Sequence, residues 1–390
     1  MNLSYNNLLS AFSLALDVQE YKNMGHARRV AYVSLRISEM LGFDEEKKKK
    51  VYYSALLHDI GKGDIYEDFY TEEWWKHADR GSKIVLKLPF GENFSEIIRY
   101  HHENYDESGH FKLKGDEIPL GAQIVFISDQ FDIRYTSLSH KEREYNIREN
   151  LKECVETNIG KMFNPLVSKA LLELMKQEKF WLDYKFFDIK SILNKIEPKD
   201  TIPIGIDELE NIAEAFADII DTRSRFTYEH SRGISNLAYQ MAKVLGYDEE
   251  TSRKIRVAGL LHDLGKLAVP NSILDKPGKL TEEEFMVMKS HVYYTKIILK
   301  EIGGIDEIAE WAANHHEKLD GSGYPEGLRG YEMGDIDKHI AVCDIFQALT
   351  EDRPYRKGMS TKEAIRIIEK EVKNGKLNEE SLEILKKVVF

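Results

Sequence analysis

Cysteine, proline and long hydrophobic runs are all scarce in this chain of 390 residues, which has two cysteines and nine prolines. Cys154 and Cys343 lie far apart without metal-ligand spacing, which argues against a disulfide framework and for a reducing compartment. The longest N-terminal apolar stretch, Leu8 to Leu16, is too short to span a bilayer and has no basic leader or cleavage pattern. We therefore expect a cytoplasmic protein without a membrane partner.

Positive charge is also in deficit. Lysine and arginine number 55 against 67 aspartates and glutamates, which gives a formal net charge of −12. An acidic surface repels polyanions, so duplex nucleic acid is not an expected partner, and a small phosphate-bearing substrate would need local positive charge. The length predicts two domains, and a hydrophobic content of 42% with 31% charged residues is typical of a folded, helix-rich protein.

The chain contains two copies of one pattern. The run Leu-Leu-His-Asp-x-Gly-Lys occurs at 56–62 and at 260–266, and its histidines are 262 − 58 = 204 residues apart. His26 and His230 keep the same offset, since 230 − 26 = 204. Three later landmarks recur at offsets of 214 or 215: His77 and His291, His101-His102 and His315-His316, Asp129 and Asp344. The second copy has therefore gained ten residues before its third histidine.

The repeat predicts the domain organisation. One domain is expected over residues 1–176 and another over 207–390, joined by a linker at 177–206 that reads as a short helix and an extended hinge. Apolar residues at three- and four-residue spacing, as at 234–245, predict helices, and Thr281 with Glu284 predicts a capping box. Gly42, Gly246 and Gly265 fall where helices should stop. We expect an all-α protein with two tandem helical bundles and a helical linker.

Seven residues of the second copy have side chains that bind metals. They exceed the four ligands of one tetrahedral ion, which favours a binuclear site with Asp263 as the bridging carboxylate. The two adjacent ligand pairs should each lie at a helix end. A lone histidine on an amphipathic helix is more often structural, but the repeated constellation favours a metal site. The seven residues are His230, His262, Asp263, His291, His315, His316 and Asp344.

The second copy resembles the HD-GYP subfamily of the HD superfamily of metal-dependent phosphohydrolases. The resemblance rests on the His-Asp-x-Gly-Lys element, on His-His-Glu-x-x-Asp-Gly-x-Gly-Tyr-Pro at 315–325, on Glu-Gly-Leu-Arg-Gly at 326–330 and on Asp-Arg-Pro-Tyr-Arg at 352–356. It implies that the seven residues are metal ligands. It also implies hydrolysis of cyclic di-GMP to pGpG or GMP, while related members act on 3′,3′-cyclic GMP-AMP.

One position departs from the pattern. Trinuclear members of the family carry a glutamate four residues before the first ligand histidine, and here that position is Phe226. We therefore predict two divalent ions, with iron or manganese favoured over zinc by the mixture of histidine and aspartate.

Further residues are expected to act on the substrate. Besides Asp263, the resemblance gives Lys266 a catalytic role at the phosphate and the leaving oxygen, although a lysine there also suits an exposed helix end. Tyr324 is expected to bind substrate by stacking or hydrogen bonding, and Arg353 and Arg356 to bind a phosphate or a base edge. The alternative for the two arginines is an ion pair with Glu351 or Asp352.

The first copy retains all seven ligand types and a lysine, Lys62, but not the Gly-Tyr-Pro loop, which is replaced at 105–111. We expect it to bind metal without hydrolysing a cyclic dinucleotide. Its other expected role is a platform for homodimerisation or for a signalling protein. The ligands of this second candidate site are His26, His58, Asp59, His77, His101, His102 and Asp129.

Two other functions fit the same residues. One is an HD phosphohydrolase that acts on other nucleotides, which the first copy would suit better than the second. The other is a sensor that binds a cyclic dinucleotide without turnover. The retained ligand set and Lys266 favour an enzyme, since a sensor needs no cage that activates water.

Overall fold

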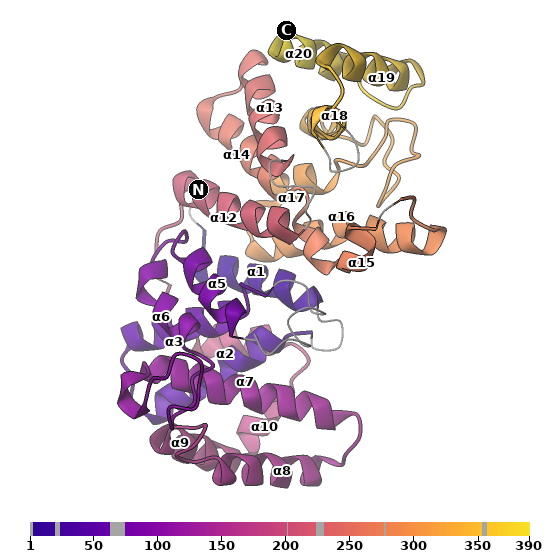
Figure 1. Cartoon of the computed structure of the whole chain (residues 1–390). Coiled ribbons are helices and arrows are strands. Elements are labelled where there is room, and N and C mark those ends of the chain that lie inside the picture. The colour runs from indigo at the N-terminus through magenta and orange to yellow at the C-terminus, as the bar shows by residue number, and fades with distance from the viewer. Residues whose placement is uncertain are drawn as a thin grey trace. The chain divides into compact units, whose positions relative to one another are not determined.

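The computed structural model describes residues 3–19, 24–62, 75–200, 202–223, 230–276, 278–352 and 357–390, and in these residues the chain is helical (Figure 1). Within this part of the chain β-type pairing is confined to isolated bridges such as Leu3 with Ile204, so the predicted all-α class is confirmed. None of its helices is both long and apolar enough to cross a membrane.

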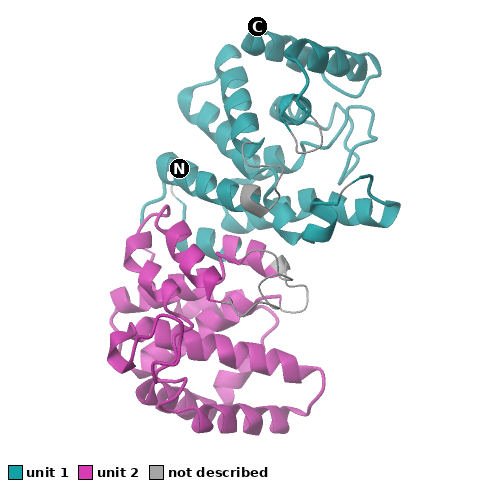
Figure 2. Cartoon of the chain, viewed as in Figure 1, with its two compact units in different colours: residues 1–11, 202–390 teal, residues 12–201 magenta. Residues whose placement is uncertain are grey.

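The chain divides into two compact units (Figure 2). Unit 1 comprises Met1–Ala11 and Ile202–Phe390, and unit 2 comprises Phe12–Thr201. The helix α1 (Tyr5–Gln19) crosses this boundary. The other helices of unit 2 are α2 (His26–Met40), α3 (Glu45–Leu57), α5 (Lys76–Val85), α6 (Ser95–Arg99), α7 (Leu120–Ser139), α8 (Glu144–Thr157), α9 (Pro165–Met175), α10 (Glu178–Tyr184) and α11 (Ile189–Ile196). Those of unit 1 are α12 (Ile206–Arg223), α13 (His230–Val244), α14 (Glu249–Leu261), α15 (Asn271–Leu274), α16 (Glu282–Ile302), α17 (Asp306–Ala313), α18 (Asp335–Thr350), α19 (Thr361–Lys373) and α20 (Glu379–Val389).

The sequence repeat extends to the helices. With the offsets of 204 to 215 residues, α2 and α3 match α13 and α14, while α5, α6 and α7 match α16, α17 and α18. The match continues through α8 and α9, which correspond to α19 and α20. The helices α10 and α11 follow α9 in the first copy. From α2 to α9 and from α13 to α20, the two units are thus copies of one helical bundle.

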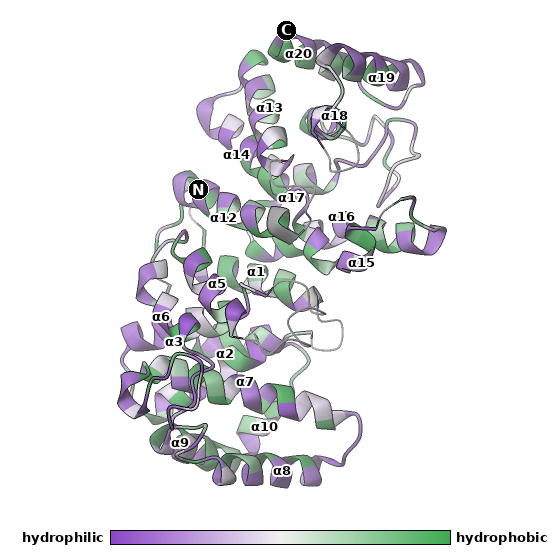
Figure 3. Ribbon diagram, viewed as in Figure 1, coloured by the Kyte–Doolittle hydropathy of each residue, from purple (hydrophilic) through white to green (hydrophobic). Residues whose placement is uncertain are grey.

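Each His-Asp pair follows a helix with a well-defined beginning and end. In α14 the side chain of Asp248 caps the first turn by accepting from the backbone N–H of Thr251, and Asp44 does the same in α3. The last turns are buried, and His262 is the C-cap residue of α14. Figure 3 shows hydrophobic and hydrophilic residues on the same helices, as expected where one face packs into a bundle. The buried face thereby fixes the position of the His-Asp pair at the helix end.

Gly265 lies inside a short 3-10 helix, η3 (Leu264–Ala268), so the prediction that it stops a helix is wrong. It is required by a close approach instead. A Cβ atom at Gly265 would lie 1.9 Å from the carbonyl oxygen of His291, and one at Gly61 would lie 2.1 Å from that of His77. The glycine of the His-Asp-x-Gly-Lys motif therefore lets the His-Asp segment contact the helix that carries the third histidine. Gly42 and Gly246, in contrast, follow the ends of α2 and α13 with φ of 69° and 81°.

We expect Gly265→Ala to destabilise unit 1 by about 1–3 kcal/mol or more, because the new methyl group overlaps backbone that cannot move independently. Thermal denaturation followed by circular dichroism measures the effect. Gly205→Ala is the control, since its Cβ would meet only the end of the flexible Glu208 side chain, at 3.2 Å. Equal melting temperatures of the two variants would contradict this packing argument.

Candidate metal centre

The seven predicted ligands of the second copy converge in unit 1. Ligand atoms of His230, His262 and Asp344 all lie within 4.8 Å of one another, and so do those of His291, His315 and His316. The first group comes from the start of α13, the end of α14 and the middle of α18. The second comes from α16 and from the turn after α17. Both adjacent ligand pairs thus lie at or just beyond a helix end, as predicted.

Asp263 lies between the two groups. One carboxylate oxygen, Oδ2, is 3.0 Å from Nε2 of His262, and the other, Oδ1, is 3.4 Å from Nε2 of His291 and 4.0 Å from Nε2 of His315. Lys266 also contacts Oδ2, at 2.5 Å. Each oxygen therefore faces a different histidine group, which is the arrangement that a bridging carboxylate requires.

Backbone carbonyl groups fix the orientation of three imidazole rings. Nδ1 of each ring lies 2.6–2.8 Å from the carbonyl oxygen three residues earlier along the chain, and donates to it. In the neutral ring the proton is then on Nδ1, which leaves a lone pair on Nε2. The pairs are His262 with Gly259, His291 with Met288 and His315 with Ala312.

These lone pairs face one another, and a cation fits between them. The Nε2 atoms of His291 and His315 are 3.5 Å apart. Among the described residues, Nε2 of His262 and Oδ1 of Asp263 are buried without a hydrogen-bond partner. Buried acceptors left in this way are costly unless a positive charge or a donor satisfies them. The residues present therefore fit a metal centre.

Burial makes the second histidine group ready to bind a metal. It lowers the pKa of His291 to about 3 and holds that of His315 well below its ordinary value. These rings are thus neutral at pH 7. Burial alone would raise the pKa of the Asp263 carboxyl. The neighbouring His262 and Lys266 outweigh burial and hold this pKa well below its usual range. A charged bridging carboxylate and neutral imidazoles are the protonation states that metal binding needs.

His230 differs from His262, His291 and His315 because a carboxylate, and not a backbone carbonyl group, lies at its Nδ1. Its Nδ1 is 3.1 Å from Oε2 of Glu351, and its Nε2 is 3.3 Å from Oδ1 of Asp344. Burial lowers the pKa of His230, but hydrogen bonds to these two carboxylates outweigh burial and raise it to about 9.

Sequence reasoning considered Glu351 only as an alternative ion-pair partner of Arg353 or Arg356. The signal for a contact with His230 was its position seven residues after Asp344, where it is the C-cap residue of α18.

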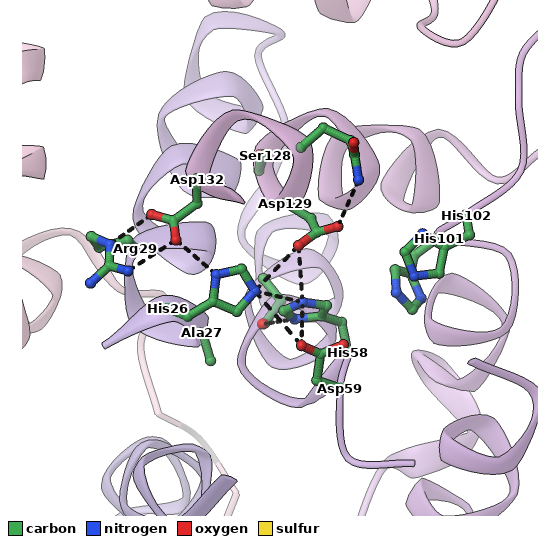
Figure 4. Close-up of polar contacts among 12 residues, drawn as sticks. His26, Ala27, Arg29, His58, Asp59, His101, His102, Ser128, Asp129 and Asp132 are labelled. Carbon is green, nitrogen blue, oxygen red and sulfur yellow. Dashed lines mark hydrogen bonds and ion pairs between the residues drawn. The ribbon is translucent and has the colours of Figure 1, made fainter. Parts of the chain in front are cut away.

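Unit 2 orients the equivalent histidine with a different residue. Nδ1 of His26 is 2.7 Å from Oδ2 of Asp132 (Figure 4). The other oxygen of this carboxylate, Oδ1, accepts from Arg29 and from the hydroxyl of Tyr184. The repeat places Gln347 where Asp132 stands, since 132 + 215 = 347, and Gly233 where Arg29 stands, since 29 + 204 = 233.

In unit 1 the residues at these two positions, Gly233 and Gln347, depend on each other sterically. A Cβ atom at Gly233 would lie 2.3 Å from Cδ of Gln347, so the glycine makes room for the glutamine. The ion pair of unit 2 is therefore absent from unit 1, and Glu351, one helical turn later than Gln347, supplies the carboxylate to His230 instead.

Two of the residues expected to contact substrate lie beside the second histidine group or the bridging carboxylate. The ring of Tyr324 lies 4.9 Å from that of His316 and 6.1 Å from that of Phe285. Burial raises the pKa of the Tyr324 hydroxyl, so it remains a hydrogen-bond donor at pH 7. Lys266 contacts Asp263, as noted above, and its side chain is 22% exposed, so it can reach solvent or a ligand. Arg353 and Arg356, like Phe226, lie outside the described residues.

Glu317 holds the loop of Tyr324 in place. Its buried carboxylate accepts from the backbone N–H groups of Glu326, Gly327 and Leu328 at 2.7–3.1 Å. A Cβ atom at Gly323 would lie 2.4 Å from the backbone nitrogen of Lys318, so the loop requires that glycine. The sequence showed this carboxylate next to the histidines, but not that it would cap the loop.

In unit 2 the seven predicted ligands of the first copy also converge. Ligand atoms of two groups lie within 4.8 Å of one another: His26 with His58 and Asp59, and His77 with His101 and His102. Asp129 contacts His26 at 3.2 Å, and the Nε2 atoms of His26 and His58 are 3.3 Å apart. Figure 4 shows His26 between Asp132 and the Asp129, His58 and Asp59 cluster. These residues therefore fit metal ions as those of unit 1 do.

A buried carboxylate that sequence reasoning missed lies near this cluster. Asp17 in α1 lines a small cavity together with His26, Asp59 and Lys62. Its Oδ1 accepts from the backbone N–H of Ala27, while Oδ2 has no hydrogen-bond partner among the described residues. Burial raises the pKa of Asp17 to about 6.

Family models and known proteins identify the class of the chain. A model described as "HD domain" matches residues 214–380, and another with the same description matches residues 23–134. The chain is 32% identical to 3′3′-cGAMP-specific phosphodiesterase 1 of Vibrio cholerae, over 99% of this chain and 93% of that protein. It is 39% identical to the cyclic di-GMP phosphodiesterase PA4108 of Pseudomonas aeruginosa, over 38% of this chain and 36% of that protein.

A solved structure supports the same class. The crystal structure of a cyclic GMP-AMP specific phosphodiesterase of Vibrio cholerae aligns with a TM-score of 0.73 at 25% identity, and covers 99% of this chain and 98% of that one. The chain belongs to the HD-GYP family of metal-dependent phosphodiesterases, and it has an HD domain in each half.

We expect Glu351→Gln to weaken metal binding at the His230 group by about tenfold to a hundredfold, because the imidazole loses the charged acceptor that orients it. Metal content after equilibration with limiting metal, measured by mass spectrometry, tests this. Adding Gln347→Asp should restore binding, because Asp132 makes this contact in unit 2. Full metal occupancy in Glu351→Gln alone would contradict the assignment.

We also expect metal affinity to rise with pH. The pKa of His230 is raised to about 9 in the metal-free protein, so the imidazole is protonated at lower pH. A protonated imidazole cannot bind a metal. Displacement of one proton makes the affinity rise by roughly tenfold per pH unit below that pKa. Calorimetric titration of metal into the metal-free protein between pH 7 and 9 measures the slope, and a constant affinity over this range would contradict the prediction.

Proposed function

We propose that unit 1 hydrolyses a 3′,3′-cyclic dinucleotide, with two metal ions held by the seven ligands. The observation that carries the proposal is the position of Asp263, whose two oxygens face two separate histidine groups. Iron or manganese suits this mixture of imidazole and carboxylate ligands better than zinc does. On this assignment, residues 207–390 form the catalytic domain and 177–206 the linker.

Cyclic GMP-AMP is the first candidate substrate. The relative and the solved structure that match almost the whole chain are named as specific for cyclic GMP-AMP. Cyclic di-GMP, which the motifs alone placed first, is the second candidate. It is favoured by the relative with 39% identity over 148 residues, which is named as a cyclic di-GMP phosphodiesterase.

The residues of unit 1 divide the work of hydrolysis. The bound metal ions would supply a water with a lowered pKa and positive charge for the phosphate oxygens. Lys266, next to Asp263, contacts a phosphate oxygen and donates a proton toward the leaving oxygen. Tyr324 offers a ring face to a base or ribose and a hydroxyl as donor. Arg353 and Arg356 are proposed to bind the second phosphate or a base edge.

Unit 2 is proposed to bind metal but not to hydrolyse the cyclic dinucleotide. It has a comparable cluster of predicted ligands, but the aromatic rings of the neighbouring loops are arranged differently. In unit 2 the ring of Trp75 stacks on that of His110, with 3.4 Å between their centroids. In unit 1 the ring of Tyr324 lies beside that of His316. A stacked pair leaves fewer ring faces for a base.

Asp263→Asn and its counterpart Asp59→Asn distinguish the two units. We expect Asp263→Asn to lower the rate of hydrolysis of cyclic GMP-AMP by about a thousandfold or more, since it removes the bridge between the ligand groups. Asp59→Asn should retain hydrolysis and lose metal from unit 2 only. Incubation with cyclic GMP-AMP, cyclic di-GMP or mononucleotides, followed by chromatography of the products, identifies which of them is the substrate. Binding of a cyclic dinucleotide without any product would contradict the enzyme proposal.

Lys266→Ala should lower kcat by about a hundredfold or more while metal content stays at the wild-type level, because a proton donor is lost and no ligand is removed. Single-turnover rates and metal analysis on the same sample measure both quantities. Lys62→Ala, the matched change in unit 2, is the control and should leave kcat unchanged. If the two variants have the same kcat, Lys266 is a helix-end lysine without a catalytic role.

A further inference from the structure

A lysine lies among aromatic rings beside the second histidine group of unit 1. The ammonium nitrogen of Lys289 is 5.1 Å from the ring centroid of Phe285 and 5.9 Å from that of Tyr324. Phe285 and Lys289 are one turn apart on α16, and the rings of Phe285 and Tyr324 meet edge to face. The ring of Tyr324 in turn lies beside that of His316, a predicted metal ligand. A single ring thus separates Lys289 from the proposed metal centre.

No acidic group accounts for the position of this lysine. Among the described residues, Lys289 forms no ion pair. Its neighbours three and four positions away on α16 are all apolar or aromatic: Phe285, Met286, Val292 and Tyr293. An ammonium group that contacts ring faces keeps N–H groups for other acceptors. Lys289 is half-buried and the ring of Phe285 is 44% exposed, so both can contact a ligand at this side of the site.

Unit 2 has different residues at the same two positions. The offset of 214 assigns Trp75 to Lys289 and His110 to Tyr324, since 289 − 75 = 214 and 324 − 110 = 214. Trp75 and His110 stack with their ring centroids 3.4 Å apart, so the faces that meet are closed to a ligand. A cation beside an aromatic ring is therefore a property of the unit that is proposed to hydrolyse the cyclic dinucleotide.

The surroundings of Lys289 favour a base over a phosphate as its ligand. At the proposed metal centre, the metal ions and Lys266 already provide positive charge for the phosphate oxygens. Lys289 lies instead beside Tyr324, the ring proposed to stack on a base, where the nearest acceptors of a bound nucleotide are on the base edge. Guanine presents two acceptors on one edge, O6 and N7, whereas adenine has a donor, its N6 amino group, in place of O6. An ammonium group only donates, so it favours guanine.

We propose that Lys289 selects guanine in the substrate of unit 1 by donating to O6 and N7 of the base that stacks on Tyr324. Cyclic GMP-AMP and cyclic di-GMP, the two candidate substrates, both contain guanine, whereas cyclic di-AMP does not. This role of Lys289 rests on the proposed hydrolysis of a cyclic dinucleotide by unit 1, to which it adds the residue that distinguishes the bases.

Binding to a chain with slowed turnover tests this role. The metal-loaded, full-length Lys266→Ala chain is titrated calorimetrically with cyclic di-GMP, cyclic GMP-AMP and cyclic di-AMP. Adding Lys289→Met should weaken binding of the first two by about tenfold or more, because the donor to guanine is lost while the length of the side chain is kept. The affinity for cyclic di-AMP should stay unchanged. Where a nucleotide is still hydrolysed, its kcat/KM takes the place of the dissociation constant.

Two further variants separate recognition of the base from packing of the rings. Lys289→Arg keeps a donor at the same place and should retain the preference for guanine. Lys300→Met is the matched control, because Lys300 lies on the same helix but pairs with Glu310 at 2.6 Å. It should leave all three affinities unchanged. Circular dichroism of each variant establishes that a loss of binding is not a loss of fold.

Two results would overturn the role of Lys289. If Lys289→Met weakens binding of all three nucleotides equally, the lysine contacts a phosphate or only holds the ring of Tyr324. If it weakens none of them, the lysine does not contact the substrate. Hydrolysis by the wild-type chain is measured separately. Either result in a chain that hydrolyses cyclic GMP-AMP contradicts the role of Lys289 alone, while guanine selection by Lys289 without any product contradicts the proposed hydrolysis alone.

Discussion

The carboxylate of Asp263 is the group on which the rest of unit 1 depends. It is buried and charged, and burying a charge without a partner would destabilise the fold. The surrounding structure provides those partners. His262 comes from the end of a capped helix, His291 from a helix that Gly265 allows to approach closely, and Lys266 from the following turn. The same contacts that make a buried charge tolerable bring two histidine groups to its two oxygens.

The two units show which parts of this arrangement are fixed and which can change. Both keep the His-Asp pair, the close-packed glycine and the lysine, since Lys62 contacts Asp59 as Lys266 contacts Asp263. The carboxylate that orients the first histidine, in contrast, comes from different positions in the two units. Asp132 supplies it in unit 2, and Glu351 in unit 1. The requirement is therefore a carboxylate at Nδ1, and its position on the helix is free to shift by a turn.

The sequence was sufficient to predict the fold class and the residues that converge, because both follow from spacing. Offsets that repeat over several landmarks imply a duplicated bundle, and adjacent ligands after apolar runs imply helix ends. Glu351 and Asp132 could not be predicted in the same way. Which carboxylate reaches an imidazole on another helix depends on how the two helices pack, and the sequence of one helix does not specify that. The role of Gly265 was misjudged for the same reason, since its partner, His291, is distant in the sequence.

The difference between the units then follows from their loops and not from their ligands. Glu317 and Glu103 cap the loop after the paired histidines in the same manner, through backbone N–H groups eight to eleven residues later. The rings that these loops carry differ. In unit 1 the loop brings Tyr324 beside His316, whereas in unit 2 His110 stacks on Trp75. The same arrangement of histidines and aspartates thus has two different neighbouring loops, which is compatible with the proposal that hydrolysis is confined to unit 1.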